Sequence, residues 1–211
     1  MSSRASASTR AAEAPAPGIV IRDSRDGDLP AIQAIYAHHV ETGFGSFEET
    51  PPDVPELARR RADHLARGLP YLVAELAGPA GAAGRADAER PADTGGRVVG
   101  YAYAAPFRPR SAYRFTVEDS IYVDPAAARR GIGRRLLAEL IRRCTALGCR
   151  QMVAVIGDSR NASSIRLHEA LGFAHAGRFR AVGRKHGRWL DIVMMQLTLG
   201  EGDTTDPPAT A

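Results

Sequence analysis

The chain has 211 residues, which is enough for one domain with a hydrophobic core and too few for two ordinary domains with flexible ends. A hydrophobic content of 44% with 25% charged residues is typical of a soluble globular protein, and no apolar run reaches the roughly 18–20 residues of a membrane-spanning helix. The net charge of +4 comes almost wholly from arginine. Lys185, the single lysine, lies outside any G-K-[ST] motif, which excludes ATP hydrolysis through a Walker A loop.

One domain is expected over residues 18–199, with flexible segments at both ends and one inside it. Residues 1–17 lack the apolar core of a secretory signal, although their arginine, serine and alanine also suit a transit peptide; we interpret them as a disordered tail. Residues 77–96 are expected to form a flexible insertion, and 200–211 a disordered polar tail. The two cysteines fit neither a C-x-x-C pair nor a secreted disulfide framework, which indicates a reducing cytoplasm.

The first half of the domain is expected to contain a strand, two helices and two further strands. Apolar and polar residues alternate in the first strand, and aspartates precede both helices, where their side chains can accept hydrogen bonds from free N–H groups. The expected elements are a strand over 19–24, a helix from Asp26 or Asp28 to about Val40, a helix from Asp53 and Pro55 to Gly68, and strands over 71–76 and 97–107.

The second half alternates strands and helices. Its first helix has a continuous apolar face, and the strand after it is almost wholly apolar, as strands buried on both faces are. The expected elements are a strand over 115–123, a helix over 133–147, a strand over 151–157, a helix from Asn161 or Ser163 to Gly172, and one or two strands up to residue 199. The predicted order is β-α-α-β-β-β-α-β-α-β-β.

Gly131 and Gly133 stand where the 133–147 helix begins. Glycines at a helix start let backbone N–H groups point at a phosphate, and the helix dipole adds positive charge there. The G-x-G pair alone is a weak signal, but its strand–turn–helix context indicates a pyrophosphate site. Four arginines surround it, although arginines on a helix surface are more often merely solvated: Arg129, Arg130, Arg134 and Arg135.

Glu118 and Asp119 are adjacent in the 115–123 strand, so their side chains point to opposite faces of the sheet. A carboxylate in the middle of a sheet is either paired and structural or has a raised pKa, as a general base does. Beside a phosphate loop we favour catalysis for Glu118. Asp119 is interpreted as a structural or gating partner.

The segments "ARRGIGRRLL" and "NASSIRLHEALGF", with the order of elements, resemble the GCN5-related N-acetyltransferase (GNAT) superfamily over about residues 19–199. The superfamily writes its pyrophosphate loop Q/R-x-x-G-x-G/A, and Ala128 in the first position departs from it. Four further segments narrow the resemblance to the phosphinothricin and methionine sulfone or sulfoximine acetyltransferases. They are "SFEETPP", "YAAPFRPRSAYRFTVEDSIYV", "IRLHEALGF" and "VGRKHGRWLD".

The resemblance implies an α/β (α+β) fold in which a mixed, mostly antiparallel sheet of about seven strands is flanked by about four helices. Strands 4 and 5 would splay apart at the acetyl-CoA site. The implied reaction is acetyl transfer from acetyl-CoA to the α-amine of a small amino acid, which needs no metal, and the implied assembly is a homodimer. None of the six histidines forms a recognisable ligand pair, which also disfavours a metal.

The resemblance also assigns site residues. Glu118 would be the general base. His168 would protonate the leaving thiolate, join a water relay or simply pack. Asn161 would contact pantetheine, although capping a helix explains it equally well. The expected acetyl-CoA contacts are Ile121, Tyr122, Val123, Arg129, Arg130, Gly131, Ile132, Gly133, Arg134, Asn161 and Ser164.

The acceptor would be held by residues of three separate segments. Arg108 or Arg110 suits the carboxylate of an amino acid, and the sequence does not decide between them. Phe47 lines the acceptor pocket in the resemblance but could equally plug the core. The expected acceptor or dimer contacts are Phe47, Arg108, Arg110, Tyr113, Lys185 and His186.

Two rival functions come from other classes. A basic nucleic-acid-binding module would need exposed aromatics among its basic residues, whereas aromatics are only 6% of this chain and lie mostly in strand patterns. A protein acetyltransferase acting on lysine or N-terminal amines would share every acetyl-CoA feature. It would differ in having an open peptide groove instead of a closed small pocket.

Overall fold

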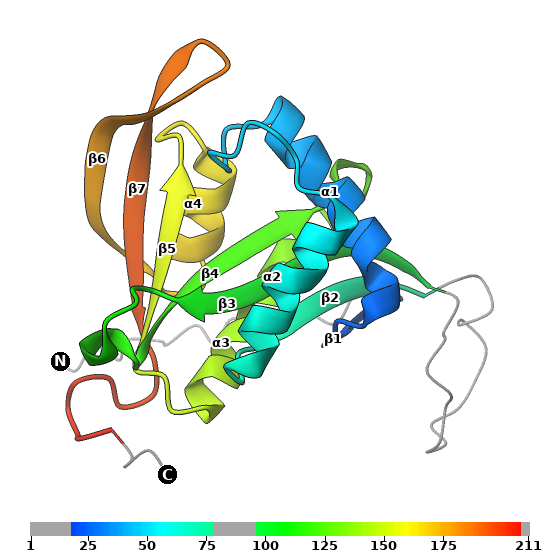
Figure 1. The fold of residues 1–211 in the computed structure, drawn as a ribbon. Coiled ribbons are helices and arrows are strands. Elements are labelled where there is room, and N and C mark those ends of the chain that lie inside the picture. Colours follow the sequence, from blue (N-terminus) through cyan, green and yellow to red (C-terminus); the bar gives the residue numbers. More distant parts are fainter. Residues whose placement is uncertain (1–17, 78–95, 208–211) are drawn as a thin grey trace, which may run out of the picture.

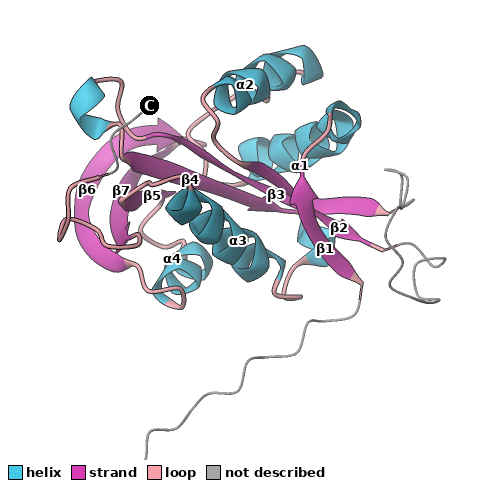
Figure 2. Cartoon of the chain, turned by 90° about the horizontal axis from the view of Figure 1, so that it is seen from below, coloured by secondary structure: helices cyan, strands magenta, loops and turns pink. Residues whose placement is uncertain are grey.

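The computed structural model describes residues 18–77 and 96–207, and these form one seven-stranded sheet with helices on both faces. Figure 2 shows the three layers, with α1 and α2 on one face of the sheet and α3 and α4 on the other. The strands are β1 (Ile19–Asp23), β2 (Tyr71–Leu76), β3 (Arg97–Pro106), β4 (Thr116–Val123), β5 (Gln151–Gly157), β6 (Ala174–Lys185) and β7 (Arg188–Thr198). The helices are α1 (Leu29–Thr42), α2 (Val54–Ala66), α3 (Ile132–Ala146) and α4 (Ala162–Glu169), with short 3-10 turns at Asp26–Asp28, Ser111–Tyr113 and Pro125–Ala127.

The order of elements confirms the sequence prediction, and the region after Gly172 forms two strands. Residues 1–17, the insertion except its ends, and residues 208–211 lie outside the described residues. Residues 200–207 of the expected C-terminal tail are described. They form a turn in which Gly202 N–H donates to Leu199 O at 3.0 Å, and Arg150 Nη2 donates to Asp206 O at 2.9 Å.

Two cores lie on the two faces of the sheet, because successive side chains of a strand alternate between faces. In β2 the fully buried Val73 belongs to the core under α1 and α2, whereas the equally buried Leu72 belongs to the core against α3. The core of the α1 and α2 face is rich in tyrosine, and the rings of Tyr101 and Tyr122 stack with centroids 5.2 Å apart.

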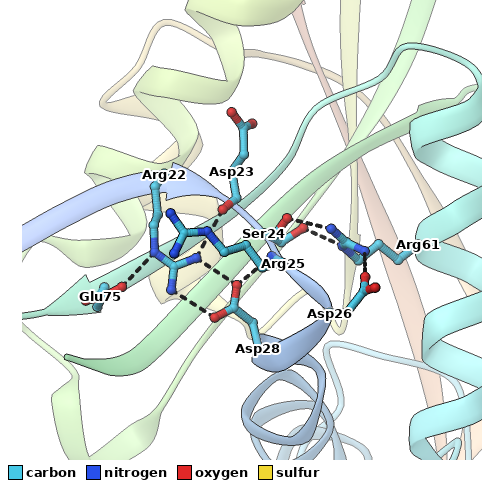
Figure 3. Close-up of polar contacts among 8 residues, drawn as sticks. All are labelled: Arg22, Asp23, Ser24, Arg25, Asp26, Asp28, Arg61 and Glu75. Carbon is cyan, nitrogen blue, oxygen red and sulfur yellow. Dashed lines mark hydrogen bonds and ion pairs between the residues drawn. The ribbon is translucent and has the colours of Figure 1, made fainter. Parts of the chain in front are cut away.

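Asp28 directly precedes α1, but its carboxylate does not cap that helix. Arg22 donates to both of its oxygens at 2.7 and 2.8 Å, and the N–H of Arg25 donates to it at 2.7 Å (Figure 3). Burial acts to raise the pKa of Asp28, but the hydrogen bonds and charge of Arg22 and Arg25 hold it below its usual value. The expected cap is therefore wrong, because a partly buried guanidinium competes for the carboxylate more strongly than helix N–H groups do.

Arg61 joins α2 to the segment between β1 and α1. Its Nε donates to Ser24 Oγ at 2.6 Å, its Nη1 donates to Asp26 Oδ1 at 2.7 Å, and its Nη2 donates to the carbonyl of Ser24 (Figure 3). Asp53 does cap α2 as expected, since its Oδ1 accepts from Glu56 N–H at 2.8 Å. The Arg61 contacts fix α2 against the segment that joins β1 to α1.

Candidate active site

β4 and β5 are the only parallel neighbours in the described sheet, and they pair for only part of their length. Pairing runs from Thr116 beside Gln151 to Asp119 beside Ala154 and then stops, although β4 continues to Val123 and β5 to Gly157. Figure 1 shows the two strands diverging. This is the splay that the resemblance predicts, and it leaves backbone groups of both strands without a sheet partner.

A cleft of about 900 Å³ opens at this splay, between the starts of α3 and α4. His39, from α1, and the turn 43–45 close its other side. Ten of the eleven residues expected to contact acetyl-CoA line the cleft, and Arg130 does not. Those that do are Ile121, Tyr122, Val123, Arg129, Gly131, Ile132, Gly133, Arg134, Asn161 and Ser164.

The turn that leads into α3 is left-handed at two positions. Gly131 has a φ of +72°, in the left-handed region, as has Arg129 at +64°. A Cβ at Gly133 would lie 3.3 Å from Leu167 Cδ2, on the cleft lining, so glycine keeps this wall open. At these two glycines no side chain projects into the space before the N–H groups of the helix start.

Asn161 caps α4, since its Oδ1 accepts from Ser164 N–H at 3.3 Å and from Ser163 Oγ at 3.0 Å. Its side chain also lies on the cleft lining. The two explanations offered for this asparagine are therefore compatible, because Oδ1 serves the helix and the amide nitrogen remains available to the cleft.

On the cleft side of β4, Asp119 contacts His168 of α4. His168 Nε2 lies 3.1 Å from Asp119 Oδ2, and both side chains are almost wholly buried. The Nδ1–H of His168 donates to Ser164 O at 2.7 Å, because a carbonyl oxygen only accepts. One further proton must therefore lie between Nε2 and Oδ2, whichever group carries it. Burial lowers the pKa of His168, but the hydrogen bond and charge of Asp119 outweigh it and the net shift is upward.

Asp119 Oδ1 is buried without a hydrogen-bond partner among the described residues. Burying a carboxylate oxygen without a hydrogen-bond partner costs folding free energy, and such unpaired groups are often found at functional sites. Asp119 and His168 both line the cleft. The sequence predicts Asp119 to be a structural or gating partner, and in the structure it contacts His168.

Glu118 lies on the opposite face of β4 and is not part of the cleft lining. Partial burial raises the pKa of its carboxyl, and the negative charge of Asp119 raises it further, while Arg108 opposes the shift. Arg108 lies with its guanidinium over the ring of Phe107, 4.4 Å from the centroid, and Tyr113 meets the same ring edge-on at 5.8 Å. Arg110 is exposed beside them, with no ion pair among the described residues.

The other expected acceptor residues gather around the loop 43–50. Lys185 is buried and donates to Ser46 O at 2.8 Å, which ties β6 to that loop. His186 lies edge-on to Phe44 at 5.5 Å. Phe47 packs over two glycines, since a Cβ at Gly183 would overlap its ring and one at Gly157 would lie 3.0 Å from it.

His39 was missed by the sequence reading. Its Nε2–H donates to the carbonyl of Val123 at 2.9 Å, and burial lowers the pKa of its imidazole, which favours the neutral ring. The bond holds the end of β4 that no longer pairs with β5 in place beside the cleft. The two residues are 84 positions apart in the sequence, and a histidine on an amphipathic helix gives no signal of such a contact.

Comparison with known proteins agrees with the acetyl-CoA site that the geometry indicates. The model of the acetyltransferase (GNAT) family matches residues 46–173. The chain belongs to this family. It is 52% identical to phosphinothricin N-acetyltransferase of Alcaligenes faecalis over 187 residues, covering 89% of this chain and 86% of that protein. Its enzyme class, N-acetyltransferase, and its GNAT fold are thus as predicted.

Two further relatives resemble the chain along most of their length. An L-methionine sulfoximine/L-methionine sulfone acetyltransferase of Pseudomonas aeruginosa is 43% identical over 182 residues, covering 85% of this chain and 94% of that protein. The crystal structure of a phosphinothricin acetyltransferase from Sinorhizobium meliloti in complex with acetyl-CoA superposes with a TM-score of 0.78. It is 48% identical and covers 90% of this chain and 93% of that one.

Within the described residues, 18–77 and 96–207, no group of three or more His, Cys, Asp or Glu side chains is placed to hold a metal ion. Over the same ranges, no helix has both the length and the apolar character that crossing a membrane requires.

Proposed function

We propose that this protein transfers the acetyl group of acetyl-CoA to the α-amine of a small amino acid or analogue, of the phosphinothricin and methionine sulfone or sulfoximine type. The observation that carries the proposal is the placement of Glu118 on the face of β4 opposite the cleft, next to the point where β4 and β5 separate, with Arg108 of the loop after β3 near enough for its charge to act on Glu118. An amine beside Glu118 would thus reach a thioester held in the splay. The names of the similar proteins support the same acceptor class.

The cleft suits acetyl-CoA. The N–H groups at the start of α3 would hold the pyrophosphate, with Arg129, Arg130 and Arg134 close by. The amide nitrogen of Asn161 and Ser164 would bind pantetheine, and the splayed ends of β4 and β5 would flank it. When bound, acetyl-CoA supplies a thioester whose carbonyl carbon accepts the amine.

Glu118 would take the proton that an α-amine carries at neutral pH, directly or through a water molecule. Its raised pKa suits this role, because a carboxylate with stronger proton affinity is a better base. The oxyanion would meet backbone N–H groups of β4. Asp124 N–H donates to Val99 O on the β3 side at 2.9 Å, so by alternation the N–H groups of Val123 and Ile121 point toward the unpaired β5 side.

His168 and Asp119 would return a proton on the other face of the strand. The proton between them would pass to the sulfur as the carbon–sulfur bond breaks, leaving neutral His168 beside ionised Asp119. Asp119 is a positioning residue in this scheme, because it acts through His168. Uptake at Glu118 and release at His168 balance the protons of one turnover.

The alternative, a protein acetyltransferase, would use the same cleft with a peptide in place of the amino acid. One experiment decides between them. The protein is incubated with acetyl-CoA and, separately, methionine sulfone, phosphinothricin, their carboxamides, and a peptide with a free N-terminus and a lysine, while free thiol is followed. Release with free amino acids and little with the amides or peptide supports the proposal, whereas equal release with the peptide contradicts it.

A homodimer in the cytoplasm belongs to the same proposal. β6 ends the sheet and is exposed along nearly its whole length, and the β6–β7 hairpin extends past the end of β5 (Figure 1). Phe179, Val182 and Trp189 of this hairpin are 56%, 54% and 67% exposed, which is unusual for side chains of this size. A second copy would cover them. Cys144 and Cys149 are both free, which suits a reducing compartment. Light scattering of the wild type and of Val182→Glu tests the dimer.

A further inference from the structure

A second hollow lies on the Glu118 face of the sheet and shares no lining residue with the acetyl-CoA cleft. Its volume is about 230 Å³. Sites that hold a whole small ligand usually measure about 300–1,000 Å³, so this hollow suits part of a molecule. Its apolar wall is formed by Phe107, Val153, Ala176 and Met194.

The hollow is close to Glu118 along the strands. Val153, on its wall, is the partner of Glu118 in the β4–β5 pairing, and Thr116 on its lining precedes Glu118 by two residues on the same face. Two residues of a strand span about 7 Å. The splay begins on the other side of Glu118, past Asp119, so Glu118 stands between the thioester end of the cleft and the hollow.

The polar part of the lining contains amides and hydroxyls and no charged side chain. Thr116, Tyr113, Gln151 and Gln196 provide it. Gln196 Nε2 donates to Gln151 Oε1 at 2.9 Å, which uses one of the four N–H groups of the two carboxamides. Neither amide donates to any other described residue. The remaining N–H groups can therefore serve oxygen atoms of a ligand.

We propose that this hollow receives the side chain of the acceptor amino acid and recognises oxygen atoms at its end through the Gln151–Gln196 pair. This inference rests on the proposed function. With the α-amine at Glu118 and the α-carboxylate at Arg108, the side chain lies along β4. From the α-nitrogen to the oxygens of a sulfone on a methionine skeleton is about 6–7 Å, comparable with the strand distance. Sulfone, sulfoximine and phosphinate groups share this chemistry of oxygens on a tetrahedral centre.

The test compares methionine sulfone with norleucine, which has a similar length and no terminal oxygen. Gln151→Leu and Gln196→Leu should each lower kcat/KM for methionine sulfone roughly three- to tenfold, the worth of one neutral hydrogen bond, and leave norleucine unchanged or better. An equal loss with both acceptors, or no loss with either, would overturn the inference.

Ala176→Phe gives a second, independent measurement that does not alter the amide pair. Ala176 is exposed on β6, so the ring can be accommodated without disturbing the core and would fill the hollow. We expect kcat/KM to fall tenfold or more with methionine sulfone and norleucine, and much less with alanine, whose side chain does not reach the hollow. Unchanged activity with all three would overturn the inference.

The matched control is Val20→Phe, which adds a ring at a half-exposed position of β1, the other edge of the sheet, and should change no acceptor preference. Failure of the proposed function and failure of the side-chain site give different results. If the wild type acetylates no free amino acid, the proposed function fails. If it acetylates amino acids, only the side-chain site fails under two results: the glutamine variants keep the wild-type preference between methionine sulfone and norleucine, and Ala176→Phe keeps the wild-type preference between methionine sulfone and alanine.

Discussion

Replacing Glu118 with glutamine tests the proposed base most directly. Glutamine keeps the size and shape of the side chain and removes only its ability to accept a proton. Loss of a general base typically costs a factor of about 10²–10⁴ in rate, or roughly 3–5 kcal/mol in the barrier. We expect such a fall in kcat/KM for methionine sulfone at neutral pH, followed as thiol release, while the Kd of acetyl-CoA stays unchanged because Glu118 is not part of the cleft lining.

The pH dependence sharpens the test. Burial, and then the charge of Asp119, raise the pKa of Glu118 above its ordinary 4.5, while Arg108 opposes them. Protonated Glu118 cannot act as a base, so wild-type kcat/KM should fall as pH drops through this raised pKa. The variant has no group that titrates there and should lose this acid limb.

Stability should move in the opposite direction to activity. A carboxyl whose pKa is raised by folding disfavours the folded state once it ionises, so its contribution to the free energy of unfolding is most favourable below 4.5 and declines as pH rises through the folded pKa. Glu118→Gln should therefore raise Tm at pH 7 and leave it nearly unchanged at pH 4. Glu41→Gln, the same change at an exposed position of α1, is the control for both measurements. Turnover within threefold of wild type, or an acid limb that persists in the variant, would refute Glu118 as the base.

Three further predictions address the cleft, the buried pair and the fold. Gly133→Val should weaken acetyl-CoA binding at least tenfold by calorimetry, because its Cβ would press on Leu167 at 3.3 Å; unchanged affinity in a folded variant contradicts the phosphate site. Asp119→Asn should lower kcat, and it should lower Tm more at pH 6 than at pH 9. The raised pKa of His168 contributes stability below about 6.5, and this contribution is lost as pH rises through the folded pKa. A Tm difference that does not depend on pH contradicts the shared proton. Arg61→Met should lower the free energy of unfolding, measured in urea, by about 1.5–3 kcal/mol and leave KM unchanged. A change in KM would contradict a purely structural role for Arg61.

Much of the site was predictable because its features are local in the sequence. The period of two in a strand separates Glu118 from Asp119 without any knowledge of the partner strands. The glycine pair and the apolar face of α3 likewise fix the helix start and its orientation on the sheet. These features depend on residues within a few positions of one another, and pattern reasoning is reliable at that range.

The contacts that escaped prediction join distant segments. The bond between His39 and Val123 and the contact of Lys185 with Ser46 span 84 and 139 positions. The competition of Arg22 for Asp28 shows a different limit, because the local rule for a helix cap was sound and a closer, charged partner overrode it. Such outcomes depend on which side chains the fold brings together, and one sequence does not reveal that.

The two adjacent carboxylates now have a physical relation beyond their opposite directions. The charge of Asp119 contributes to the raised pKa of Glu118, so the two groups influence each other across a single strand. In the proposed mechanism, loss of the proton shared by His168 and Asp119 makes that pair more negative and strengthens the affinity of Glu118 for the proton of the amine. The proposed mechanism thus places the acceptor and the thiolate on opposite sides of one strand, and proton loss on one side favours proton uptake by Glu118 on the other.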